Sequence, residues 1–248
     1  MNNKYKRAYG WQPDIPDNRD YLYSAIKPVI KLPKKTDLRQ LCSQVEDQGA
    51  LGSCTAQALA GNLEFLDNMV DKEYIDVSRL FIYYNERALM DTVDYDSGAS
   101  IRVGIKTLRE HGSCREKMWP YNIKKFDVRP STACYSEAKG HVISAYHRIT
   151  RLDEMMACLA DGYPFVFGFT VYESFESAKV NKTGVVNMPG PEESAIGGHA
   201  VMGVGYDQKT ERFIVRNSWG EKWGMDGYFT MPFEYLETLA DDFWTIRK

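Results

Sequence analysis

The spacing of apolar residues changes midway along the chain, and this change limits the fold more than any other feature. In the first half, apolar residues recur at steps of three and four, which is typical of one face of an α-helix. In the second half they form short runs rich in Val, Phe, Ile and Tyr, which is typical of β-strands. Helices first and strands later predict an α+β protein with two lobes that meet at a cleft.

The expected elements have recognisable ends. Serine precedes two of the helical patterns as an N-cap residue, at Ser53 and Ser78, and glycine follows two others, at Gly112 and Gly162. The predicted helices cover residues 54–70, 79–89, 101–111 and 152–160, and the predicted strands cover 165–171, 199–206, 212–216 and 227–231. Residues 207–211 join two of these strands as a hairpin loop.

Composition excludes several classes of protein. The 248 residues are 44% hydrophobic, which is ordinary for a globular protein, and 31 basic against 34 acidic residues give a net charge of −3. This balance favours neither nucleic acid nor a membrane as partner, and the apolar runs are too short to span a bilayer. We find no signal peptide, so we expect a cytoplasmic location by default and a monomer.

The cysteines and histidines do not suggest a metal site. Five cysteines without an export signal are expected to be mostly reduced, although a Cys114–Cys134 bridge stays open for an oxidising compartment. No CxxC, HxxxH or HExxH spacing occurs in the chain, so we expect no structural zinc and no cofactor.

Three segments carry chemistry. Residues 48–54 place Gln48 and small residues before Cys54, at the expected start of a helix, where backbone N–H groups stabilise a thiolate and an oxyanion. Taken alone, such a cysteine is more often a buried structural residue. His199 opens a glycine-rich strand, and Asn217 ends the next one, so a hairpin brings them side by side. Asn217 then orients the imidazole toward Cys54.

These segments resemble the papain-like (C1 family) cysteine peptidases. The resemblance rests on residues 48–54, on 198–201, and on 217–220 followed by 223–224 and 227–228, in the family's order and spacing. It covers residues 32–248 and implies the papain-like fold, with a helical left lobe, an antiparallel barrel-like right lobe and the cleft between them. It also implies hydrolysis of peptide bonds through a thioester, on a peptide or protein substrate.

The resemblance assigns roles to individual residues. Cys54 is the nucleophile, His199 the acid/base, Asn217 its orienting partner and Gln48 an oxyanion donor. Trp219 shields the Asn217–His199 bond from water. For substrate binding, Gly98 matches the glycine whose backbone pairs with an extended substrate, and Gly197 and Gly198 lie beside His199; Gly168, Gly197 and Ala200 are candidates for a roomy apolar pocket.

The chain also departs from the family pattern. Leu51 stands where relatives have a disulfide cysteine, and Thr55 replaces a tryptophan beside the nucleophile, so local packing must differ. Only 31 residues precede the domain, where many relatives have a longer inhibitory segment. Two other functions stay open: amidase or transpeptidase chemistry on the same residues, and a silent binding module that keeps the fold.

Residues 1–31 are expected to form an extended arm, because three prolines stand among five aromatic side chains. Six basic and three acidic residues give this arm +3 and leave −6 for the rest of the chain, which favours docking. The aromatic side chains also need burial. The arm either covers part of the cleft as a short regulatory segment or packs as padding on the outer face of a lobe.

Overall fold

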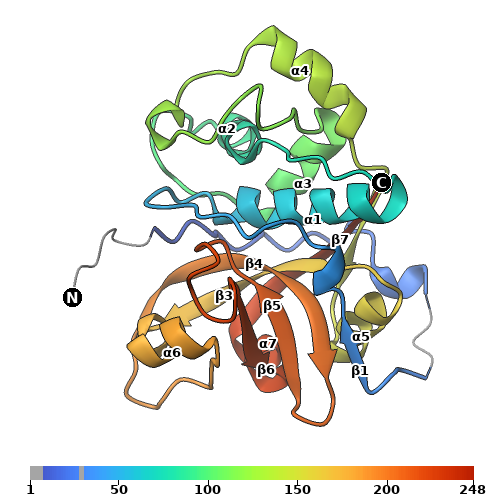
Figure 1. Ribbon diagram of the computed structural model, residues 1–248, viewed down its shortest axis with the longest axis vertical. Helices are drawn as coiled ribbons and strands as arrows, with labels where there is room; N and C mark the ends of the chain where they lie inside the picture. Colours follow the sequence, from blue (N-terminus) through green and yellow to red (C-terminus); the bar gives the residue numbers. More distant parts are fainter. Residues whose placement is uncertain (1–7, 28–30) are drawn as a thin grey trace.

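The structure is a computed structural model that describes residues 8–27 and 31–248. Four helices gather on one side of the molecule, and an antiparallel sheet with three further helices fills the other (Figure 1). The helices are α1 Cys54–Val70, α2 Arg79–Leu89, α3 Ile101–Glu110, α4 Thr132–Ala138, α5 Leu152–Ala160, α6 Ala178–Thr183 and α7 Phe233–Leu239. The strands are β1 Lys35–Asp37, β2 Ala145–Ile149, β3 Phe165–Tyr172, β4 Ala195–Asp207, β5 Arg212–Arg216, β6 Tyr228–Pro232 and β7 Ala240–Arg247.

The four helices predicted from the sequence are confirmed as α1, α2, α3 and α5. The Ser78 hydroxyl accepts the Phe81 N–H at the start of α2, and Gly112 adopts a left-handed φ of 72° just after α3. The expected side-chain cap at Ser53 is wrong. Its hydroxyl lies 2.6 Å from the hydroxyl of Tyr121 and caps no backbone N–H of α1.

The strands form one antiparallel sheet in the order β2-β7-β3-β4-β5-β6, with β1 added beside β4. The sheet is not closed into a barrel, because its end strands β2 and β6 do not pair with each other. Helix α1 covers one face of the sheet, and α5 and α7 pack on the other. The β4–β5 hairpin is confirmed, with its loop between Asp207 and Arg212. Strands β1, β2 and β7 and helices α4, α6 and α7 were not among the predicted elements.

Strand β4 begins four residues earlier than expected, at Ala195, so His199 lies within the strand and not at its end. Gly197 and Gly198 belong to the ladder, opposite Val171 and Thr170 of β3. Glycine is unfavourable in a strand unless another backbone approaches closely. Here the N-terminal arm is that backbone, as described below.

Alternate residues of the central strands separate two cores. On β3, Val166 belongs to the core shared with α1, whereas Phe165 and Phe167 belong to the core beneath α5 and α7. On β4, Ala200 faces the first core and Val201 the second. The sheet is therefore buried on both faces, and α1 lies directly against the strand that carries His199.

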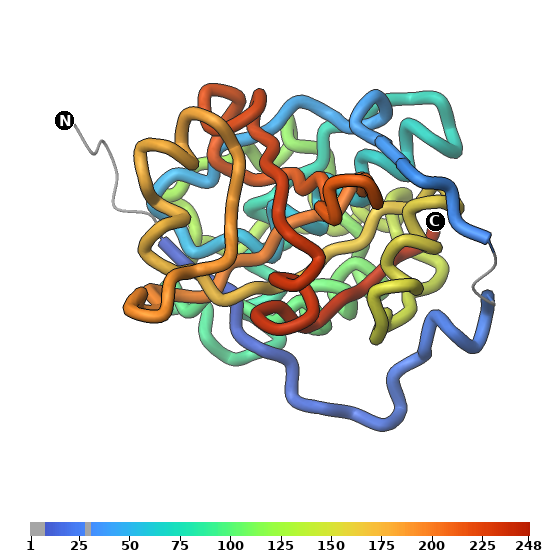
Figure 2. The backbone as a smooth tube through the Cα atoms, turned by 90° about the horizontal axis from the view of Figure 1, so that it is seen from below, coloured from blue at the N-terminus to red at the C-terminus, as the bar shows by residue number. Residues whose placement is uncertain are grey.

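The arm crosses the molecule between the helices and the sheet and then follows the outer edge of the sheet (Figures 1 and 2). Trp11 forms a bridge with Ala99, and Leu22 forms one with Arg148 of β2. Tyr23 is fully buried among the residues under α5, and its hydroxyl donates to Asp161 at 2.9 Å. The arm thus lies between the two lobes and also packs on the sheet, which are the two positions that the sequence left as alternatives.

The charge argument for docking is only partly correct. The arm's acidic Asp20 pairs with Arg102 at 2.6 Å and with Arg148 at 3.3 Å, opposite in sign to the expectation. Lys27, paired with Asp161 at 2.6 Å, follows the expected sign. The basic residues at 4, 6 and 7, which contribute most of the arm's charge, lie outside the described residues.

Replacing Tyr23 with alanine should destabilise the whole protein, because the ring is fully buried in the sheet core. We expect the free energy of unfolding in urea to fall by about 3 kcal/mol. The matched control is Tyr21→Ala, since the Tyr21 side chain is 65% exposed and should change stability by less than about 1 kcal/mol. Equal losses in the two variants would contradict an anchoring role for Tyr23.

Candidate active site

Cys54 is the first residue of α1, as expected, and it is fully buried. The loop before it is fixed by hydrogen bonds from outside the loop. The Gly52 N–H donates to the carboxylate of Asp96 at 3.0 and 3.1 Å, and the Tyr121 hydroxyl donates to the Gln48 carbonyl at 2.9 Å. No sequence pattern marks Asp96 or Tyr121 as part of the site, because the residues that they contact are distant in the chain.

The structure brings His199 and Asn217 together across the β4–β5 hairpin. The imidazole Nε2 lies 2.8 Å from the Asn217 Oδ1, which also accepts the Ser218 N–H at 2.9 Å. An amide oxygen only accepts, so Nε2 carries the hydrogen of this bond. The Trp219 ring stacks on the imidazole, with ring centroids 5.2 Å apart, and His199, Asn217 and Trp219 are all buried.

The side chain of Gln48 is held at both ends of its amide. Its Oε1 accepts the Ser218 hydroxyl at 2.6 Å, and its Nε2 donates to the Leu51 carbonyl at 2.9 Å. The same Nε2 donates to the carbonyl of Ala8, in the arm, at 3.3 Å. The amide N–H₂ of Gln48 therefore points at a peptide carbonyl that lies in the cleft.

Thr55 changes the packing beside Cys54, as the departure from the family pattern suggests. Its hydroxyl donates to the carboxylate of Glu86 at 2.8 Å, and both side chains are buried. Burial raises the pKa of Glu86 to about 8. A buried polar pair thus occupies the position where relatives place a tryptophan.

Arm residues 8–12 lie over these side chains. Gly10 accepts the Ala99 N–H at 2.8 Å, Gln12 donates to the Ala99 carbonyl at 2.9 Å, and Trp11 donates to the Gly198 carbonyl at 3.1 Å. The Tyr9 ring packs against the rings of His199 and Trp219, with centroids 6.1 and 6.3 Å apart. The arm therefore bridges the two lobes directly above the candidate site.

The glycines expected to bind substrate contact this arm. A Cβ at Gly197 would lie 2.7 Å from Tyr9, and one at Gly198 would lie 2.8 Å from Trp11. The backbone of the arm pairs with Ala99, the residue after Gly98. Gly98 instead provides space, since a Cβ there would lie 2.1 Å from the Gly10 carbonyl oxygen.

The acidity of the candidate nucleophile depends on its burial. Burial raises the pKa of Cys54 to about 11, and the charge of Glu86 acts in the same direction, whereas hydrogen bonds from the backbone of Ala200, Gly10 and Thr55 act in the opposite direction. The thiolate expected from the sequence is therefore disfavoured in this structure, where the Cys54 side chain is fully buried.

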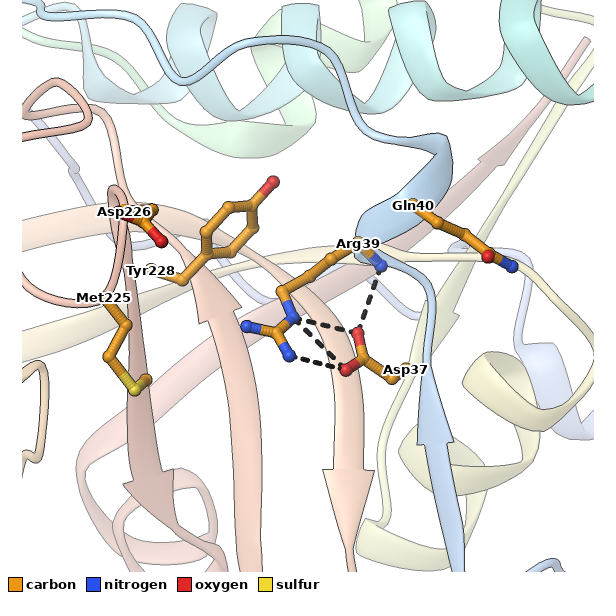
Figure 3. A pocket seen from close by; sticks show the side chains of 6 residues that line it. All are labelled: Asp37, Arg39, Gln40, Met225, Asp226 and Tyr228. Carbon is orange, nitrogen blue, oxygen red and sulfur yellow. Dashed lines mark hydrogen bonds and ion pairs between the residues drawn. The ribbon is translucent and has the colours of Figure 1, made fainter.

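Other features of the described residues are weaker candidates for a functional site. All five cysteines are free thiols, and among residues 8–27 and 31–248 no three His, Cys, Asp or Glu side chains gather as metal ligands. A second hollow lies apart from the candidate site (Figure 3). Its lining is Asp37, Arg39, Gln40, Met225, Asp226 and Tyr228. Arg39 is paired there with Asp37 at 2.7 Å, and none of the candidate catalytic or substrate-binding residues lines the hollow.

The fold and the site together define a two-lobed α+β cysteine peptidase, and comparison with known proteins agrees. The model of the papain family cysteine proteases matches residues 32–237. The chain therefore belongs to the papain family of cysteine proteases, and it is a thiol protease, a hydrolase that acts on protein or peptide substrates.

Individual relatives support this assignment. An uncharacterised peptidase C1-like protein of Acanthamoeba polyphaga mimivirus is 44% identical over 271 residues, which cover 98% of this chain and 87% of that protein. Chymopapain of Carica papaya is 26% identical, over 87% of this chain and 58% of its own length. The crystal structure of xylellain, a cysteine protease from Xylella fastidiosa, has 43% identity and a TM-score of 0.91, and covers 100% of this chain and 98% of its own.

Alkylation of Cys54 in the native chain should require unusually high pH. With a pKa of about 11, against 9.0 for an ordinary cysteine, its thiolate fraction at pH 8 is about a hundredfold lower. Iodoacetamide labelling followed by mass spectrometry of the Cys54 peptide measures this, with the urea-unfolded chain as control. Native labelling at pH 8 as fast as in the unfolded chain would contradict the raised pKa.

Proposed function

We propose that Cys54, His199, Asn217 and Gln48 carry out the peptide hydrolysis of this protease. The observation that supports this assignment best is the His199–Asn217 hydrogen bond, which fixes the imidazole tautomer beside a cysteine at a helix start. A helix N-terminus stabilises a thiolate through its partial positive charge. An oriented imidazole is the base that such a nucleophile needs.

The reaction then follows in two stages. The Cys54 thiolate attacks the scissile carbonyl carbon, and the Gln48 Nε2 and the Cys54 backbone N–H hold the resulting oxyanion. The imidazolium of His199 protonates the leaving amine as the C–N bond breaks, which leaves a thioester on the sulfur. His199 next takes a proton from water, which attacks the thioester, releases the carboxylate product and restores the thiolate–imidazolium pair.

We also propose that arm residues 8–12 keep the enzyme latent. Gln48 donates to the carbonyl of Ala8, whereas the Cys54 sulfur is hydrogen-bonded by the backbone of Gly10. The candidate nucleophile and the candidate oxyanion donor therefore form hydrogen bonds with two different residues of the arm. The arm occupies the cleft without presenting one carbonyl to both groups, as a substrate must.

Gly10→Ala should release the arm. A Cβ at Gly10 would lie 1.8 Å from the Gly52 carbonyl oxygen, which is backbone and cannot move aside easily. We expect Cys54 alkylation at pH 7 to become at least about tenfold faster, and kcat/KM for a peptide to rise, because the thiol regains contact with water. Stability in urea should change by less than about 1 kcal/mol, since Tyr23 still anchors the chain.

The matched control for this experiment is Gly140→Ala, because a Cβ at Gly140 meets nothing within 4 Å. It should leave both labelling and stability unchanged. If Gly10→Ala lowers the melting temperature sharply and leaves the alkylation rate unchanged, the arm is structural padding and the latency proposal fails.

Substitutions in the Gly10→Ala background should show how much each of the four site residues contributes to kcat. Cys54→Ala should abolish peptide cleavage, and Gln48→Ala should lower kcat by about 10²–10³ through loss of an oxyanion donor. Asn217→Ala should lower kcat less than His199→Ala, because it orients the imidazole and transfers no proton. Cleavage retained by the Cys54→Ala chain would show that another residue is the nucleophile.

We further propose that residues 1–31 act as an extension of a peptidase domain formed by residues 32–248, and that the protein works as a monomer without nucleic acid or membrane. The net charge of −3 supports this reading. Among the described residues, no helix has the length and apolar character needed to cross a bilayer. Size-exclusion chromatography with light scattering tests the oligomeric state directly.

A further inference from the structure

The Trp11 side chain lies in a slot of the cleft whose walls include two glycines. A Cβ at Gly168 would lie 1.9 Å from the indole Cε2, and one at Gly198 would lie 2.8 Å from the indole Cε3. These glycines lie on neighbouring strands, since β3 pairs with β4. The absence of both side chains leaves room for a large flat ring, and any added methyl group would intrude on it.

Asp242 contacts the indole N–H within this slot. Its side chain is fully buried, and its backbone adopts a φ of 57°, which is uncommon for a residue other than glycine. Its Oδ1 lies 3.1 Å from Nη2 of Arg148. Its Oδ2 accepts the indole N–H of Trp11 at 3.2 Å and the backbone N–H of Asp14 at 2.7 Å. The body of the protein thus binds one oxygen of Asp242, and the arm binds the other.

Departure of the arm therefore leaves a specific deficit. The two hydrogen bonds that the arm makes to Oδ2 of Asp242 are lost together, and a side chain that refills the slot displaces water from this oxygen, so a side chain without a donor would bury the oxygen unsatisfied. A side chain that enters the slot and brings an N–H to the same point removes that deficit. An indole has both the flat shape that fits between the glycines and the donor at the right edge of the ring.

The charges around the slot disfavour a cation as the alternative donor. Asp241 and Asp242 both lie 3.1 Å from Arg148, and Arg102 lies nearby, paired with Asp20 of the arm. Once the arm leaves, two carboxylates of the body remain with two guanidinium groups, so their charges balance. A substrate arginine would find no excess negative charge there, whereas a neutral N–H donor needs none.

We propose that the Trp11 slot is a specificity pocket of the protease and that Asp242 makes it select a tryptophan side chain in the substrate. This inference rests on the proposed function, because it assumes that the arm leaves the cleft and that Cys54 then cleaves peptides. The arm residue Trp11 is in this reading a mimic of the substrate side chain.

The test uses the full chain with Gly10→Ala and Trp11→Ala together (the Trp11→Ala chain below), which releases the arm, vacates the slot and keeps Tyr23 in place. Peptides carry tryptophan, benzothienylalanine, phenylalanine, arginine or alanine at each position around the scissile bond in turn. Benzothienylalanine has the shape of tryptophan with sulfur in place of the N–H. At one position, kcat/KM for tryptophan should exceed that for benzothienylalanine by about tenfold or more, as expected for a hydrogen bond to a carboxylate.

Three further variants, each in the Trp11→Ala chain, identify the cause of such a preference. Asp242→Asn should bring the ratio of tryptophan to benzothienylalanine to within about threefold of one, because it removes the charge and keeps the shape. Gly168→Ala should lower kcat/KM for the tryptophan peptide by a factor at least about tenfold larger than for the alanine peptide, because the added methyl group intrudes on the ring. Gly140→Ala, the matched control, should change neither.

The outcomes separate this proposal from the proposed function. Peptide cleavage without any preference for tryptophan over benzothienylalanine, at every position, overturns the pocket and leaves the protease assignment intact. A preference for arginine that Asp242→Asn removes also overturns it, since selection is then by charge. Absence of cleavage of every peptide by a folded chain contradicts the proposed function itself.

A second measurement does not depend on cleavage or on the folding of any one variant. In the full chain, Trp11→Phe keeps a flat ring and removes the N–H, so Cys54 alkylation should accelerate. Asp242→Asn should accelerate it by a larger factor in the Trp11 chain than in the Trp11→Phe chain, because in the latter only the bond to the Asp14 N–H remains to be weakened. Equal acceleration in both backgrounds would show that Asp242 does not recognise the indole.

Discussion

The packing of helix α1 on strand β4 is the contact on which the site depends. The helix begins at Cys54, and the strand carries His199, so this single contact sets how the two candidate catalytic side chains face each other. Small residues allow the close approach: Ala56 of the helix and Ala200 of the strand lie in one core. Chemistry that requires reacting atoms at near-contact distance needs such a rigid support, because small displacements lower the rate steeply.

The arm combines an anchor and a cover, and the anchor explains how a short cover can be effective. Tyr23 is buried in the sheet core, whereas residues 8–12 use a few backbone hydrogen bonds and one indole. Because the cover is tethered, its binding is intramolecular and its effective concentration is in the millimolar range for a short flexible connection. Individually weak contacts therefore suffice to close the cleft, and a single steric change can open it.

Local signals made much of this structure predictable, and the misses arose from contacts between distant residues. Caps and glycines located the helices, and hairpin logic placed His199 beside Asn217. The Ser53 cap failed because Tyr121, 68 residues away, takes its hydroxyl. The role of Asp242 could not be predicted, because no sequence pattern marks a buried carboxylate at a left-handed φ. In addition, buried and exposed residues do not alternate regularly along its strand. Burial likewise raises the pKa of Cys54, opposite to the direction expected from its position at a helix start.

The Trp11 side chain indicates more about substrates than the backbone of the arm does. Its path past Gly52 is open only to glycine, since a Cβ at Gly10 would overlap the Gly52 carbonyl oxygen. An ordinary peptide with a side chain at that point must therefore follow another backbone path, so the arm's hydrogen bonds need not be those of a substrate. The Trp11 slot carries no such restriction, because its glycines and Asp242 belong to the body of the protein and not to the arm. A cover that differs from a substrate in its backbone and shares one side-chain pocket with it can close the cleft tightly and still escape cleavage.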